Sequence, residues 1–166
     1  MRVYLPLTVP LLRTALDVGA IGPAPLTGYA VTPSLREWYA EGDTDELEYA
    51  ATLAAARGSL RLLEDDDSAP RRRVVVAADV ANASIRPVPD VERAAVLITD
   101  VVRLALVSAA MVDDTSTARI VGSAAKVVRQ ADIGDEDAEF AVGEAEALEL
   151  QWYATQEMKR LVEADD

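Results

Sequence analysis

Apolar residues recur along this chain with two different periods, one typical of helices and one typical of strands. The clearest helical period runs from Asp45 to Glu64, where the spacing alternates between four and three residues and marks one face of an α-helix. The apolar positions on that face are Tyr49, Leu53, Ala56, Leu60 and Leu63. We predict that this helix buries Leu53 and Leu60 against a sheet. A second amphipathic helix is predicted over residues 115–131.

A continuous apolar run, Val74 to Ala78, is rich in β-branched residues. Such a run is typical of a strand that is buried on both faces, so we place the centre of a sheet there. Shorter apolar segments predict further strands at residues 3–5, 27–31, 94–98, 107–112 and 150–154. Residues 82–93 include two prolines and are expected to form an exposed connection.

Thr8 and Thr32 each precede a helical pattern with a proline in its first turn, which is a common way for a helix to begin. Further helices are predicted over the acidic residues 135–148 and after Thr155. Strands and helices therefore alternate along the chain. This pattern predicts a single globular domain over residues 1–166, of the α/β or α+β class. We expect a mixed sheet of about five or six strands with amphipathic helices packed on it.

The composition restricts the chemistry more than it restricts the fold. The 166 residues include no Cys and no His, which excludes disulfides, thiolate metal sites, Ser-His-Asp and Cys-His nucleophiles, and His-based zinc sites. Neither of the glycine-rich nucleotide fingerprints is present. No cofactor is therefore expected, and the balance favours a protein that is not an enzyme. Without an apolar run of about 20 residues or a signal-like N-terminal segment, a cytoplasmic location is expected.

The net charge is −13, and the acids are densest in residues 132–149, which hold eight acids and no Lys or Arg. Nucleic acids and anionic membranes attract basic surfaces, so neither is an expected partner. We expect an acidic interaction face for a basic protein partner, formed by Asp135, Glu139, Glu146 and Glu149. The alternative is that these acids only keep the protein soluble. The sequence leaves the oligomeric state open.

Two carboxylates follow predicted strands and suggest a different function. Asp79 and Asp113 come directly after apolar runs, and Arg73 precedes one of them. If these residues met at one sheet edge, they could form the Mg²⁺ or anion site of a small enzyme. The favoured interpretation is that Asp79 and Asp114 are helix caps or turn residues, and that Arg71–Arg73 balances nearby acids. No metal site is predicted.

Five segments spread over nearly the whole chain carry a resemblance to a known family. They are MRVYLP at residues 1–6, AVTPSLRE at 30–37, DELEYAA at 45–51, RRVVVAADV at 72–80 and LQWYATQE at 150–157. Together they resemble a family of short actinobacterial proteins defined only as a domain of unknown function. The resemblance implies a one-domain length and assigns no catalytic residue. The expected function is therefore an acidic, non-enzymatic interaction or regulatory module, with the small Mg²⁺-dependent or anion-binding enzyme as the alternative.

Overall fold

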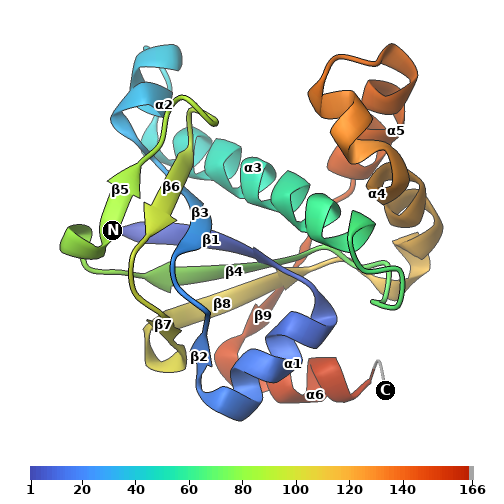
Figure 1. The fold of residues 1–166 in the computed structure, drawn as a ribbon, viewed down its shortest axis with the longest axis horizontal. Coiled ribbons are helices and arrows are strands. Elements are labelled where there is room, and N and C mark those ends of the chain that lie inside the picture. The colour runs from blue at the N-terminus through green and yellow to red at the C-terminus, as the bar shows by residue number, and fades with distance from the viewer. Residues whose placement is uncertain (165–166) are drawn as a thin grey trace.

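An antiparallel sheet forms the middle layer of the computed structural model, which describes residues 1–164 (Figure 1). Within these residues the sheet has seven strands, and every neighbouring pair is antiparallel. Their order is β5 (Ile85–Pro87), β6 (Ala95–Ile98), β3 (Leu26–Ala30), β1 (Arg2–Leu7), β4 (Val74–Asp79), β8 (Val107–Val112) and β9 (Gln151–Ala154). β2 (Ala20–Ile21) and β7 (Val102–Arg103) form a separate two-stranded ladder. The predicted mixed sheet of five or six strands is thus corrected to a larger, antiparallel one.

Strand β4 is buried on both faces, as its continuous apolar run predicts. Val74 and Val76 belong to the core cluster on one face of the sheet, whereas Val75 and Ala77 belong to the cluster on the other. β4 is an interior strand between β1 and β8, but β1 occupies the middle position. The apolar run therefore predicts burial on both faces correctly, but the central strand of the sheet is the neighbouring strand β1 and not β4.

Helices cover both faces of the sheet. α1 (Val9–Val18) and α6 (Met158–Glu163) lie on one face, and α2 (Pro33–Trp38) and α3 (Thr44–Glu64) lie on the other (Figure 1). The predicted threonine caps are confirmed, because Oγ1 of Thr8 accepts a hydrogen bond from the Leu11 N–H and Oγ1 of Thr32 accepts one from the Leu35 N–H. Short 3-10 helices, Asn82–Ser84, Leu104–Leu106, Thr115–Thr117 and Thr155–Glu157, connect several elements.

Helix α3 forms as predicted, but its N-terminal half presents a different face to the sheet. Leu60 is fully buried, whereas Leu53 is half-buried and Tyr49 is 62% exposed. Small residues at Ala51 and Ala55 contact the sheet instead, because they let the helix lie close to it. Gly58 marks the tightest point, since a Cβ there would lie 3.1 Å from two ring atoms of Pro6.

Helices α4 (Ala118–Asp132) and α5 (Glu136–Glu146) form an antiparallel hairpin with Gly134 in the left-handed conformation between them. The hairpin packs on the C-terminal half of α3, where Leu60 and Leu63 join it in a third core cluster. Asp114 caps the 3-10 turn Thr115–Thr117, which leads into α4, by accepting a hydrogen bond from the Ser116 N–H, as predicted.

None of the helices in residues 1–164 combines the length and apolar character that crossing a membrane requires.

Candidate functional site

A groove lies along helix α3, and its lining includes residues of α2 on one side and Glu146 of α5 on the other. Figure 1 shows α2 and α5 on either side of α3. We call it the α3 groove; its cavity has a volume of about 300 Å³. Half-buried side chains of α3 form its floor, the end of α2 and the segment before β6 form one wall, and α5 forms the other. The lining residues are Leu35, Trp38, Tyr39, Ala50, Leu53, Ala54, Arg57, Glu92, Arg93, Ala94 and Glu146.

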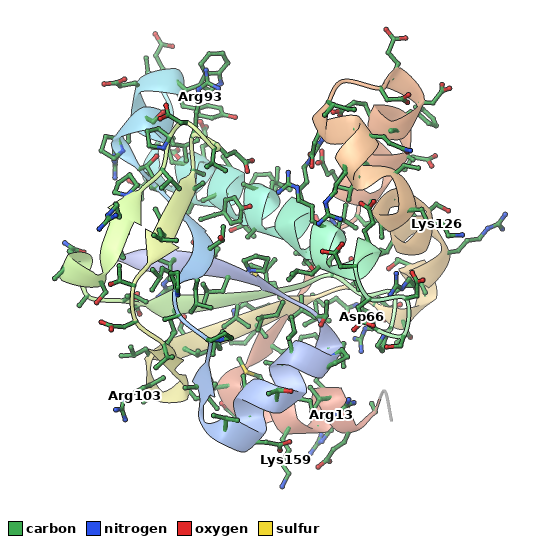
Figure 2. All side chains as sticks on the ribbon, viewed as in Figure 1. Arg13, Asp66, Arg93, Arg103, Lys126 and Lys159 are labelled. Atoms are coloured by element: carbon green, nitrogen blue, oxygen red, sulfur yellow. The ribbon has the colours of Figure 1, made fainter. Side chains whose placement is uncertain are left out.

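The α2 wall is aromatic. Trp38 is 62% exposed, and Tyr39 beside it is also exposed. The guanidinium carbon of Arg93 lies 3.7 Å from the centroid of the Trp38 ring, in a cation–π contact. Figure 2 shows Arg93 next to α2, while Arg13, Arg103 and Lys159 lie at the far side of the sheet. The Thr32 hydroxyl also donates a hydrogen bond to the Arg93 carbonyl, which ties the start of α2 to this wall.

The α5 wall is held to the floor by Arg57. Its guanidinium lies 2.9 Å from a carboxylate oxygen of Asp132, 3.0 Å from one of Glu139 and 3.3 Å from one of Glu146. Arg61, one helical turn further along α3, contacts Asp132 through Nε and Nη2 at 2.8 and 2.9 Å. Three of the eight acids in residues 132–149 therefore bind arginines of α3, which are distant from them in the sequence.

The surroundings of Asp132 and Glu92 shift the pKa values of these two carboxyl groups in opposite directions. The hydrogen bonds from Arg61 lower the pKa of Asp132, and those from Arg57 add to the effect against the cost of burial. Burial raises the pKa of Glu92, and the positive charges of Arg61 and Arg57 offset this only in part. Glu92 is thus a carboxylate of the groove whose ionised form is poorly solvated.

The acidity of the protein is concentrated in two segments, each of which contributes residues to the groove lining. Residues 37–48, from the end of α2 into α3, hold six acids and no Lys or Arg, and residues 132–149 hold eight and none. The rest of the chain carries 15 acids and 16 bases, so it is close to neutral. The net charge of −13 is therefore a local property of the two segments that flank the α3 groove.

The four acids predicted as one interaction face have separate roles. Glu139 and Glu146 bind Arg57, and Asp135 caps α5 by accepting a hydrogen bond from the Ala138 N–H. Glu149 lies after α5 and lines a different cavity. The exposed acids of α5 that form no ion pair within the described residues are Glu136, Asp137 and Glu144.

The condition of the alternative hypothesis, that Asp79 and Asp113 meet at one sheet edge, is not met. β4 and β8 are antiparallel, with Val74 opposite Val112, so the ends of these strands lie at opposite edges. Asp113 is fully buried and accepts two hydrogen bonds of 2.8 Å from the Arg73 guanidinium. Arg73 and Asp113 are therefore brought together, and Asp79 is not with them.

Asp79 is not the N–H cap that we expected. It is exposed, and its two carboxylate oxygens accept hydrogen bonds from the Arg2 guanidinium at 2.9 and 3.1 Å. These hydrogen bonds lower the pKa of Asp79. In residues 1–164 no group of three or more acids is arranged to hold a metal ion.

The family model named "Family of unknown function (DUF6912)" matches residues 1–162, which is nearly the whole chain. The chain belongs to this family. Comparisons with curated proteins and with solved structures found no match. Membership in DUF6912 confirms the resemblance to a domain of unknown function and carries no activity.

Sequence reasoning missed most of the groove. Arg57, Glu92, Arg93 and Trp38 had no place in the predicted site. One signal was present, because residues 37–48 lack bases just as residues 132–149 do. Two acidic segments in one chain would have pointed to a shared surface.

Proposed function

We propose that this protein is a non-enzymatic interaction module that binds a basic segment of a partner protein in the α3 groove. The proposal is carried by two observations: the floor of the groove is largely apolar, and the two acidic segments each contribute residues to its lining, Trp38 and Tyr39 from one and Glu146 from the other. A surface of this kind combines apolar contact area with attraction for positive charge.

The floor and the aromatic wall supply the apolar contact area. Ala50, Leu53 and Ala54 are half-buried on the exposed flank of α3, and Trp38 and Tyr39 rise beside them. Trp, Tyr and Arg are the residues most often found to dominate binding energy at protein interfaces. Small side chains in a groove floor also favour an amphipathic helix as the occupant, with its apolar face against α3.

The walls supply the charge complementarity. Glu136, Asp137 and Glu144 are exposed on α5 and form no ion pair within the described part of the chain, so their negative charge near the groove is not neutralised. Acids on both walls also attract a basic segment over a distance, which raises the rate of association and makes it sensitive to salt. The Mg²⁺-dependent alternative finds no comparable support, because its two carboxylates lie at opposite ends of β4.

The proposal is tested with a designed amphipathic peptide of Leu and Lys, compared with a Leu and Glu peptide of the same pattern. We expect calorimetry to show binding of the Lys peptide alone, weakening as NaCl is raised. The double variant Asp137→Asn, Glu144→Gln should weaken binding by at least about threefold, since each removed rim charge contributes a fraction of a kcal/mol. Trp38→Ala should weaken it by about tenfold or more.

The matched control removes two charges from the other side of the sheet. Asp17 of α1 and Glu163 of α6 are exposed and lie away from the groove. Asp17→Asn, Glu163→Gln should leave the affinity for the Lys peptide within about twofold of the unmodified protein. Equal weakening by both double variants, or equal affinity for the two peptides, would refute the proposal.

A further inference from the structure

A second cavity, of about 280 Å³, lies on the opposite flank of α3 from the groove. Leu53 separates the two, because it lines both. The walls of this cavity come from α3, from Met111 of β8 and from the segment between α5 and β9. They are mostly apolar, with Ala56, Leu148 and Leu150 among them.

One buried cation lines this otherwise apolar cavity. The Arg73 side chain is 1% exposed, and its Nε and Nη2 atoms donate hydrogen bonds to Asp113. Nη2 also reaches the Leu148 carbonyl at 3.3 Å. Within residues 1–164 its remaining nitrogen, Nη1, donates to no protein acceptor. Nη1 is not among the buried donors that lack a partner, so it is accessible from the cavity, where water or an oxygen of a ligand can accept its hydrogen bond.

The charges around the cavity define which acceptor fits. Asp113 already balances the charge of Arg73 through two hydrogen bonds of 2.8 Å, and Glu149 adds a negative charge to the lining. An anionic ligand would therefore meet repulsion without a free cation to offset it. A neutral carbonyl or ether oxygen can accept from Nη1 without this penalty.

We propose that this cavity binds a small neutral molecule with an apolar body and one oxygen acceptor. The oxygen accepts a hydrogen bond from Nη1 of Arg73, and the apolar body contacts Leu53, Met111 and Leu150. A volume of about 280 Å³ is at the small end of ligand sites, which sets the ligand at fragment size. The proposal is independent of the α3 groove and would hold even if no basic partner bound there.

Three probes test the class of ligand on the unmodified protein: acetophenone, ethylbenzene and benzoate. Binding is followed by NMR through the methyl signals of Met111, Leu148 and Leu150 and the guanidinium signals of Arg73. We expect acetophenone to shift both sets, and to bind about fivefold more tightly than ethylbenzene, which lacks the acceptor. Benzoate should bind more weakly than acetophenone.

Each opposite result overturns the proposal. The absence of acetophenone shifts up to its solubility limit would mean that water fills the cavity. If ethylbenzene bound as tightly as acetophenone, the hydrogen bond from Arg73 would contribute nothing to binding. If benzoate bound more tightly than acetophenone, the proposal that the ligand is neutral would be refuted.

A cavity-filling variant then tests the location. Thr52 lines the cavity, whereas Thr44 is exposed at the start of α3. Thr52→Phe should reduce acetophenone binding at least tenfold, and the control Thr44→Phe should leave it unchanged. Retained binding in a folded Thr52→Phe protein, judged by circular dichroism, would place the ligand elsewhere and overturn the proposal. If Thr52→Phe does not fold, the three-probe comparison still decides.

Discussion

Arg57 and Arg73 show how much of this protein depends on single cations placed among acids. Arg57 joins α3 to three carboxylates of the α4–α5 hairpin, and Arg73 joins β4 to the end of β8. Partners 40 to 89 residues apart in sequence cannot be matched from spacing alone. The sequence shows that Arg73 stands before a buried strand and so near the core. It does not show that Asp113 rather than Asp79 is its partner, because that depends on strand direction.

At the residue scale, Glu92 gives a testable pH effect. Burial raises its pKa in the folded state above the unfolded value, so the ionised carboxylate costs folding free energy above both values. Glu92→Gln should therefore increase the free energy of unfolding at pH 7, by about 0.5 kcal/mol after allowance for solvent screening. The gain should disappear below about pH 4, where the carboxyl group is protonated in both states. Urea unfolding at the two pH values measures this, and a loss of stability at pH 7 would contradict it.

At the scale of elements, local patterns located the six α-helices and six of the nine strands of residues 1–164, but not always their contacts. The period of α3 fitted a face through Tyr49 and Leu53, yet Ala51 and Ala55 contact the sheet there. The prediction chose the face with the large apolar residues, but a helix that lies close to a sheet needs small residues at the contact. The short strands β2, β5 and β7 were not predicted, because strands of two or three residues carry no measurable period.

The attachment of α5 to α3 gives a prediction at this scale. Arg57→Met keeps the apolar stem of the side chain and removes the charge that Asp132, Glu139 and Glu146 share. We expect a loss of about 1–2 kcal/mol in the free energy of unfolding, since three acids would then face one another without a cation. Hydrogen exchange should rise in α5 more than in α4, whose apolar face remains packed. Arg36→Met, at an exposed site on α2, is the control and should change neither quantity.

At the scale of the whole molecule, the run Val74–Ala78 explains both the success and the limit of sequence reasoning. Such a run predicts that both faces of a strand are covered, and the helices on each side of the sheet confirm this (Figure 1). It does not predict the direction of the neighbouring strands. Because β4 and β8 are antiparallel, Asp79 and Asp113 lie at opposite edges of the sheet. The Mg²⁺ site of the enzyme hypothesis required these two carboxylates to be close together. Composition located the acids of residues 132–149 but not Arg57 and Arg61, which bind three of them in the folded chain.

The two acidic walls also predict how the molecule responds to salt. Residues 37–48 and 132–149 hold 14 of the 29 acids and belong to segments that flank the groove, so the repulsion within this excess of negative charge acts against the folded state. Raising NaCl from about 10 mM to 150 mM shortens the screening length from about 30 Å to about 8 Å. We expect the melting temperature to rise by about 2–4 °C, equivalent to about 1 kcal/mol for a chain of this size. The double variant Asp137→Asn, Glu144→Gln should show a smaller rise, because part of the repulsion is already removed. A fall in melting temperature with NaCl would mean that the ion pairs of Arg57 and Arg61 outweigh this repulsion, and the groove would then lack the excess negative charge that binding a basic partner requires.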